Sequence, residues 1–248
     1  GDNLEVSASD SFKIESLGEF GKSLDKENNI FITILNFFHK EFNISKNLNI
    51  KITKNIPISA GLGGGSSNGA FFIMALNKLF SLGLSIKKLQ EISLNFGSDT
   101  AFFFEKKSSI IRGRGEIIKN LNDLEEVKIL LINPKIALST KEVFSNFDRN
   151  FSSKTDDDIL MNKDVLELCK MINDLEKPAI SIVPEISNIL NNLKNHKAQI
   201  AKMSGSGASC FGIFESDEDL EKCRDFFLKN FENYFVTKTK IIHYNLAE

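Results

Sequence analysis

A run of glycines in the first third of the chain constrains its fold more than any other feature. Gly61-Leu62-Gly63-Gly64-Gly65 places four glycines in five residues, and Ser66-Ser67-Asn68 follows directly. Each glycine loses much backbone entropy on folding and brings no side chain to a core, so packing does not explain the run. Glycine instead lets main-chain N–H groups converge where a Cβ would obstruct them. The run therefore predicts a loop that exposes backbone amides.

The residues after this loop predict a helix that completes an anion site. Apolar residues recur at helical spacing over about residues 66–80, so Ser66, Ser67 and Asn68 are expected to open the helix. The first-turn N–H groups of a helix lack partners, and the helix dipole adds partial positive charge there. Triphosphate oxygens are the commonest occupant of such a site. A glycine turn capped by Ser66 is the alternative, but a cap needs one glycine rather than four.

Two other nucleotide-binding motifs do not match. The P-loop pattern G-x-x-x-x-G-K-[ST] fits Gly21-Lys22-Ser23 only at its end, because its first glycine position is Ser16. The dinucleotide pattern G-x-G-x-x-G, started at Gly61, meets Ser66 at its last position and lacks a repeated βαβ context. The glycine run therefore belongs to neither class.

The order of expected elements favours an α+β fold in two domains. The 248 residues, 42% hydrophobic and 26% charged, suffice for one large or two ordinary globular domains. Strands and helices alternate without a regular βαβ pattern, and a polar, acidic stretch near residues 121–126 predicts domains 1–125 and 126–248. Expected strands cover residues 4–6, 12–16, 48–54, 108–118 (a pair), 128–133, 198–203, 210–214 and 234–244. Expected helices cover residues 29–41 (capped by Asn28 or Asn29), 66–80, 85–94 (capped by Ser85), 159–173, 184–195 and 216–231, with a mobile loop at 147–158.

Composition excludes several classes of function. A net charge of −2 offers no basic field for nucleic acid, and no apolar stretch approaches the roughly 20 residues of a membrane span. The three cysteines and three histidines show no metal-ligand spacing, so we expect no disulfide framework and no metal site on protein ligands. The polar first residues resemble no secretory signal, which favours a cytoplasmic protein.

Several sequence blocks resemble the GHMP kinases, a family of small-molecule kinases. Pro57-x-x-x-Gly61 followed by the glycine run and Ser-Ser-Asn is similar to their phosphate loop. Further similar blocks follow in family order over nearly the whole chain: Phe96-Gly97-Ser98-Asp99-Thr-Ala-Phe102-Phe103, Ser139-Thr140-x-x-Val143-Phe144, Asn173-Asp174-Leu175-Glu176 and Met203-Ser-Gly205-Ser206-Gly207-Ala. The similarity is greatest to members that phosphorylate a tertiary alcohol of cytidine diphosphate-linked methylerythritol in non-mevalonate isoprenoid biosynthesis.

This resemblance implies a fold and a role for each residue. It implies a ribosomal-protein-S5-like N-terminal ATP-binding domain, a ferredoxin-like C-terminal substrate domain and an active site in the cleft between them. Asp99 would take the proton of the substrate hydroxyl, from a small, apolar and partly buried setting. ATP, accompanied by Mg²⁺, would bind at Lys54, Pro57, Gly61, Leu62, Gly63, Gly64, Gly65, Ser66, Ser67 and Asn68, with Lys54 beside adenine. The substrate would bind at Thr140, Phe144, Gly205, Ser206 and Gly207, with Phe144 stacked on cytosine.

Ordinary structural roles compete with several of these assignments. Lys54 could be an exposed strand lysine, Phe144 could pack in the core, and Thr140 could be an unremarkable hydroxyl. Asn173-Asp174 is expected to cap or crosslink the second domain rather than perform chemistry. No carboxylate ligand for Mg²⁺ can be named, so phosphates and water are expected to hold it.

One departure from the family bears on activity. The family's first strand, with Lys-Ile-Asn-Leu, and its Gly-Tyr-His segment do not occur, and residues 1–6 instead resemble the strand that follows them. The lysine beside the catalytic aspartate and much of the cytosine pocket would then be absent. We expect that an N-terminal segment is missing, which would leave a sheet edge unpaired and turnover weak or absent, with nucleotide binding partly retained.

Two other functions stay open from the sequence. Another small-molecule GHMP kinase, of the homoserine or mevalonate-pathway type, would lack a cytosine-stacking aromatic residue. A catalytically silent nucleotide-binding protein is suggested by the absent lysine. The balanced charge argues against a nucleic-acid-binding module. The chain is expected to be a monomer or a homodimer that contacts neither nucleic acid nor membrane.

Overall fold

The computed structural model describes residues 1–241 except residues 26, 28, 106 and 154. The chain folds into two units, each with its own hydrophobic core. Unit 1 comprises Gly1–Ile58 and Gly63–Asn120, and unit 2 comprises Ser59–Leu62 and Leu121–Glu248. The glycine run is therefore divided, because its first residues fold with unit 2 and the others with unit 1.

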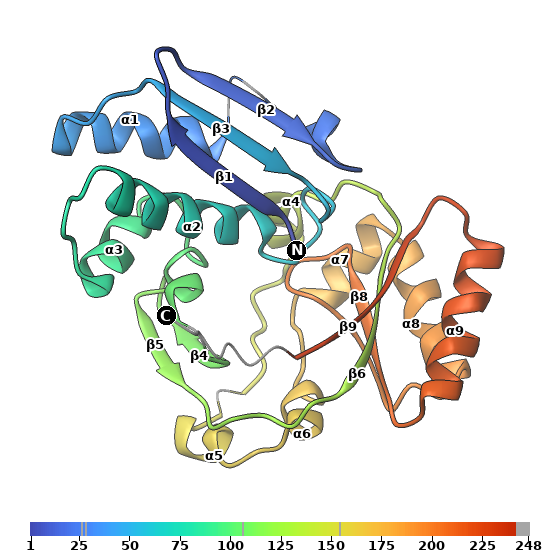
Figure 1. Cartoon of the computed structure of the whole chain (residues 1–248). Coiled ribbons are helices and arrows are strands. Elements are labelled where there is room, and N and C mark those ends of the chain that lie inside the picture. The colour runs from blue at the N-terminus through green and yellow to red at the C-terminus, as the bar shows by residue number, and fades with distance from the viewer. Residues whose placement is uncertain (26, 28, 106, 154, 242–248) are drawn as a thin grey trace. The chain divides into compact units, whose positions relative to one another are not determined.

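Unit 1 is built on a three-stranded sheet covered by helices. The strand order is β1 (Asn3–Ala8), β3 (Leu48–Thr53) and β2 (Lys13–Leu17), with β1 antiparallel and β2 parallel to β3. Leu48, Ile50 and Ile52 alternate along β3 and are fully buried, as the strand periodicity predicts. Helices α1 (Ile30–Phe42) and α2 (Gly64–Leu79) lie on one face of this sheet (Figure 1) and contribute most of the core.

Local capping fixes the helix starts in unit 1. The Asn29 side chain accepts hydrogen bonds from the amides of Phe31 and Ile32, which confirms one of the two predicted caps of α1. The predicted cap of α3 (Ile86–Ser93) is also confirmed, because Ser85 Oγ accepts from Lys88 N. A 3₁₀ turn, η2 (Ala101–Phe104), and the hairpin β4 (Ser109–Arg112) and β5 (Ile117–Asn120) complete the unit. A short 3₁₀ turn, η1 (Gly21–Ser23), follows β2.

Unit 2 is a four-stranded antiparallel sheet with helices on one face. The strand order is β7 (Ile200–Met203), β8 (Cys210–Phe214), β6 (Lys128–Asn133) and β9 (Phe235–Lys240). Helices α8 (Glu185–Asn195) and α9 (Asp217–Asn230) pack on this sheet (Figure 1). The predicted strand 234–244 is confirmed up to residue 240, and residues 242–244 lie outside the described residues. The predicted α+β class is confirmed.

The segment between β6 and α8 differs from the prediction. The single helix expected over residues 159–173 is wrong, because the chain forms α5 (Asp157–Met161) and then α6 (Val165–Cys169). Asp164 starts α6 through a reciprocal capping box with Glu167, which interrupts the longer helix. The short helices α4 (Thr140–Ser145) and α7 (Glu176–Ile182) were not predicted, because one or two turns give little periodicity.

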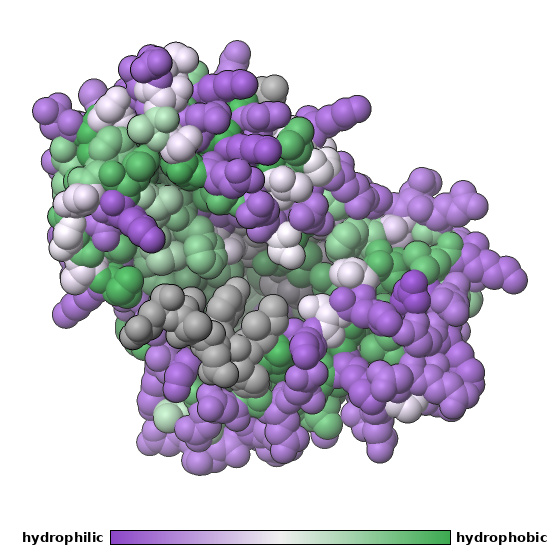
Figure 2. Space-filling model, in the orientation of Figure 1, coloured by the Kyte–Doolittle hydropathy of each residue, from purple (hydrophilic) through white to green (hydrophobic). Residues whose placement is uncertain are grey.

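Charged and apolar side chains share the surface of the molecule. Figure 2 shows mostly hydrophilic side chains around α9, whose first turn carries Asp217, Glu218 and Asp219. It also shows hydrophobic atoms in the region of α2 and α3, where Phe71 and Ile86 are exposed. None of the helices in the described ranges is both long and apolar enough to cross a membrane.

Candidate active site

The glycine run ends in the first turn of α2. The helix begins at Gly64, two residues before the predicted start, so Gly64 and Gly65 are helical rather than part of the loop. Gly63 caps the helix in the left-handed conformation, with φ of 65°. A Cβ on Gly63 would lie 2.7 Å from Cζ of Phe103, so both the backbone angle and the Phe103 ring require glycine here.

The amides of this segment are available to a ligand. Ser67 N donates to Gly63 O over 2.8 Å, but the amides of residues 61–66 donate to no acceptor within the described part of the chain. Gly65 is exposed, and a Cβ placed on it would meet no atom within 4 Å. Because α2 directs its unpaired first-turn amides and its positive dipole end here, the segment has the features that favour an anion.

Asp99 lies in a turn next to the start of α2. The turn closes through a 3.1 Å hydrogen bond from Thr100 N to Gly97 O, after the end of α3. A Cβ on Gly97 would lie 3.9 Å from Ser66 Oγ, so the Asp99 turn adjoins the first turn of α2. The expectation of a partly buried carboxylate is wrong, because Asp99 is exposed while Thr100 after it is fully buried. The Asp99 carboxylate is therefore open to solvent, in a turn that adjoins the start of α2.

Lys54 is buried at the end of β3 rather than exposed. Only 4% of the residue is exposed, so the alternative of a solvated strand lysine is wrong. Its Nζ donates to Asp2 Oδ2 over 2.5 Å and to Ile56 O over 2.9 Å. Asp2 was not predicted as part of the site, because nothing in the local sequence links it to a lysine more than fifty residues away.

Ionised Asp2 should make the stability of the protein depend on pH. Burial alone would raise its pKa, but hydrogen bonds from Lys54, Asn68 and the Ile56 amide, with the Lys54 charge, lower the pKa below the ordinary 3.8. Because the folded-state pKa lies below that of the unfolded chain, ionised Asp2 stabilises the folded state above about pH 5, and this is lost as the pH falls through the folded-state pKa.

Urea unfolding between pH 7 and pH 3 tests this dependence. The wild type should lose more unfolding free energy over this range than Asp2→Asn, whereas Asp10→Asn, at an exposed aspartate, should follow the wild type. If the unfolding free energies of the wild type and Asp2→Asn fell in parallel with pH, the expectation would be contradicted.

The first residues of the glycine run pack within unit 2. Ser204 Oγ donates to Gly61 O over 2.9 Å, and Ser209 N donates to Ala60 O over 3.2 Å. A Cβ on Gly61 would lie 2.4 Å from Ser204 O, so this close approach requires glycine. The first residues of the glycine run therefore pack against the loop that carries Gly205, Ser206 and Gly207.

The predicted substrate residues of unit 2 gather at this second glycine loop. Thr140 and Ser206 share a hydrogen bond of 2.9 Å between their hydroxyl oxygens. Phe144 lies one turn after Thr140 on α4 and is 54% exposed, so the alternative of core packing is wrong. Thr140, Phe144 and Ser206 therefore form one accessible group.

Asn173 and Asp174 stabilise this part of unit 2, as predicted. Asn173 Nδ2 donates to Met203 O over 3.1 Å and to Gly205 O over 2.9 Å. Asp174 Oδ2 accepts from the amide and hydroxyl of Ser152. Both are structural contacts, and those of Asn173 hold the second glycine loop.

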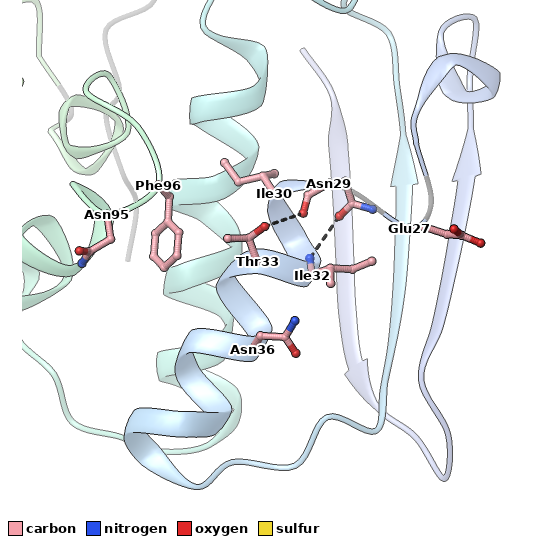
Figure 3. A pocket seen from close by; sticks show the side chains of 8 residues that line it. All are labelled: Glu27, Asn29, Ile30, Ile32, Thr33, Asn36, Asn95 and Phe96. Carbon is pink, nitrogen blue, oxygen red and sulfur yellow. Dashed lines mark hydrogen bonds between the residues drawn. The ribbon is translucent and has the colours of Figure 1, made fainter.

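A pocket of about 560 Å³ lies in unit 1 beside the start of α1. Figure 3 shows Phe96 facing α1 near Thr33, with Asn36 one turn further along the helix. Ile30 lines the pocket and also contacts α2, because its Cδ1 is 2.6 Å from the position of a Cβ on Gly69. Ile30 therefore lies between the pocket and α2. Its lining residues are Glu27, Asn29, Ile30, Ile32, Thr33, Asn36, Asn95 and Phe96.

Known families match both halves of the chain. The GHMP kinases N terminal domain matches residues 29–106, and the GHMP kinases C terminal domain matches residues 158–233. A 4-diphosphocytidyl-2-C-methyl-D-erythritol kinase of Wolbachia pipientis wMel is 36% identical over 248 aligned residues, which cover 96% of this chain and 85% of that protein.

Solved structures share the fold. A crystal structure of 4-(cytidine 5'-diphospho)-2C-methyl-D-erythritol kinase has a TM-score of 0.73 and 24% identity, covering 96% of this chain and 85% of that one. Homoserine kinase from Cytophaga hutchinsonii has the same TM-score of 0.73 at 16% identity, covering 98% of this chain and 86% of that one. The fold alone therefore does not distinguish among substrates of such kinases.

Proposed function

The chain belongs to the GHMP kinase family, and on that premise we propose that it transfers the γ-phosphoryl group of ATP to the 2-hydroxyl group of 4-diphosphocytidyl-2-C-methyl-D-erythritol. Two observations carry this proposal: within the described residues the amides of residues 61–66 have no acceptor, and the turn that contains Asp99 adjoins the first turn of α2. The 36% identity with a kinase named for this substrate favours it over the homoserine and mevalonate-pathway types.

Phosphoryl transfer requires alignment and stabilisation of charge more than covalent chemistry by the protein. The backbone amides at the start of α2 would bind the β- and γ-phosphate oxygens, and the Ser66 and Ser67 hydroxyls would donate to the same oxygens. Asp99 would accept the proton of the substrate hydroxyl as its oxygen attacks the γ-phosphorus. Asp99 is exposed, so its carboxylate is accessible to a substrate hydroxyl.

The residues at this site are compatible with Mg²⁺ bound together with ATP. The hydroxyls of Ser66 and Ser67 are hard oxygen donors, which Mg²⁺ prefers. No group of three or more His, Cys, Asp or Glu side chains suited to a metal ion occurs among the residues described. Phosphate oxygens and water would therefore supply most ligands, and the ion would neutralise phosphate charge.

The pocket beside α1 is proposed to take the nucleoside of ATP. Its amide and hydroxyl side chains, Asn36, Asn95 and Thr33, can donate to and accept from a base, and the Phe96 ring offers a flat apolar surface. Pro57 and Lys54 belong to the same nucleotide-binding part of unit 1, where Lys54 acts through its ion pair.

Thr140, Phe144 and Ser206 in unit 2 are proposed to bind the cytidine substrate. Phe144 presents an accessible ring to the cytosine, and Thr140 offers a hydroxyl on the same helix face. Gly205, Ser206 and Gly207 would direct backbone groups to the substrate alcohol or the transferred phosphate.

An ATP-coupled assay with product analysis tests the reaction. The purified chain should consume ATP in proportion to 4-diphosphocytidyl-2-C-methyl-D-erythritol and yield the 2-phosphate. Phosphorylation of homoserine or mevalonate instead would move it to another branch of the family. Binding of an ATP analogue without turnover of any of these alcohols would identify a silent nucleotide-binding protein.

Phe144→Ala should weaken binding of the cytidine substrate. A stacked base contributes about 1–3 kcal/mol, so the KM for this substrate should rise about tenfold while the KM for ATP stays constant. Phe151→Ala is the matched control, because Phe151 is 73% exposed and contacts Phe147. Steady-state kinetics measure both values, and an unchanged KM in Phe144→Ala would exclude the stacking role.

A further inference from the structure

We propose that Asp2 is a positioning residue for the phosphate loop. Its carboxylate binds the chain before the glycine run at residues 54–56 and also Asn68 of α2 after it, and so holds the loop amides ready for phosphate. This inference rests on the proposed function, because it assumes that the loop binds a nucleotide.

The Asp2 carboxylate accepts every hydrogen bond that links residues 54–56 to Asn68. Asp2 Oδ1 accepts from Asn55 N at 2.8 Å and from Ile56 N at 2.9 Å. Asp2 Oδ2 accepts from Lys54 Nζ at 2.5 Å and from Asn68 Nδ2 at 2.8 Å. Each oxygen therefore has two donors, and the donors lie on both sides of the glycine run.

Asp2, Lys54 and Asn68 form a buried cluster, and burial makes their contacts specific. The side chains of Asp2 and Lys54 are 2% and 5% exposed, and Asn68 is 9% exposed. Within such surroundings an unpaired charge or amide is costly, so the four donors and the carboxylate specify one arrangement. That arrangement fixes where Asn68, and with it the first turns of α2, lie relative to residues 54–56.

The consequence for the loop follows from chain entropy. Residues 57–67 connect two anchors that one side chain holds together, so fewer loop conformations compete with the arrangement that exposes the amides. Two of the connecting residues before α2, Gly61 and Gly63, are glycines, whose backbone has more conformational freedom than that of other residues. Ordering before binding lowers the cost of binding an anion, since less flexibility is lost when phosphate arrives.

Lys54 and Asn68 take different roles from those the sequence analysis expected. Nζ of Lys54 lies 3.5 Å from the position of a Cβ on Gly64, so its charge sits beside the first residue of α2. A cation near a helix N-terminus is unfavourable, and the Asp2 carboxylate offsets it. The Asn68 amide donates to Asp2, so Asn68 acts on the nucleotide through Asp2.

Asn68→Ala tests the proposal with a control on the same helix. The variant removes the anchor after the loop and leaves the Asp2–Lys54 ion pair in place. Asn77→Ala is the control, because Asn77 near the other end of α2 also uses its amide in hydrogen bonds, to Leu84 N and Leu84 O. Both variants lose an interior amide of one helix, but only Asn68 is connected to the loop.

Calorimetry with the non-hydrolysable analogue AMP-PNP measures nucleotide binding without the second substrate. Asn68→Ala should raise its Kd about tenfold or more, as expected when a hydrogen bond to a charged group is lost. The KM for ATP should rise similarly, while kcat and the KM for the cytidine substrate stay within twofold. Asn77→Ala should lower the Tm comparably and leave the Kd unchanged.

Two outcomes would overturn the proposal. Asn68→Ala could leave the Kd within twofold of the wild type, or Asn77→Ala could raise it by the same factor, which would indicate general destabilisation. Asn68→Ser carries the same expectation if the alanine variant does not fold, because its short side chain cannot reach Asp2.

The binding measurement also separates this proposal from the proposed reaction. A wild type that binds AMP-PNP but does not phosphorylate the cytidine substrate would refute the reaction and leave the role of Asp2 testable. A wild type that binds no AMP-PNP would refute both.

Discussion

Asp99→Asn is expected to lower kcat by about 10²–10⁴-fold, the usual contribution of a general base. Asparagine is nearly the same size, so the turn held by the Thr100–Gly97 hydrogen bond and the neighbouring start of α2 should persist. The side chain can no longer accept the hydroxyl proton, whereas the amides that are proposed to bind phosphate are untouched. Single-turnover kinetics with ATP and the cytidine substrate should therefore show a slow chemical step.

The same variant should bind AMP-PNP as tightly as the wild type. Asp10→Asn provides the control, because Asp10 is an exposed aspartate on the loop between β1 and β2. A kcat for Asp99→Asn within threefold of the wild type would remove Asp99 from the reaction and leave the site as a nucleotide-binding site only.

Gly63→Ala should impair nucleotide binding about 100-fold and lower the Tm. Its Cβ would lie 2.7 Å from the Phe103 ring, so the first turn of α2 or the ring has to move. A shift of the helix start displaces the amides that hold phosphate, and overpacking of this kind typically costs about 1–3 kcal/mol. Calorimetry with AMP-PNP and thermal unfolding measure the two effects.

Gly83→Ala isolates the cause of that effect. Gly83 has φ of 66°, close to the 65° of Gly63, but a Cβ there would meet no atom within 4 Å. Both variants incur the penalty of a left-handed alanine, about 1–2 kcal/mol, and only Gly63→Ala meets Phe103. Equal losses of AMP-PNP affinity in both would show that the helix start does not position the nucleotide.

Features set by neighbouring residues could be predicted from the sequence. The caps at Asn29 and Ser85 and the burial pattern of β3 depend on contacts within a few residues, and all are confirmed. The helix after the glycine run was predicted too late by two residues, because glycines argue against a helix while the fold accepts them in its first turn.

Features set by distant residues could not be predicted in the same way. Asp2 contacts Lys54 and Asn68 across 52 and 66 positions in the chain, and Ser204 reaches Gly61 across 143 positions. The exposure of Asp99 is likewise opposite to what its surroundings in the sequence indicated, and the burial of Lys54 decides between two alternatives that the sequence left open.

The sequence by itself determined that a glycine-rich turn before an apolar helix must present free amides, because backbone sterics and unpaired helix ends are local properties. The folded chain alone decided which side chains hold that turn. It brought Asp2 to residues 54–56 and to Asn68, on both sides of the glycine run, and it brought Ser204 to Gly61 within the run, because hydrogen bonds between distant segments form only where packing brings those segments together.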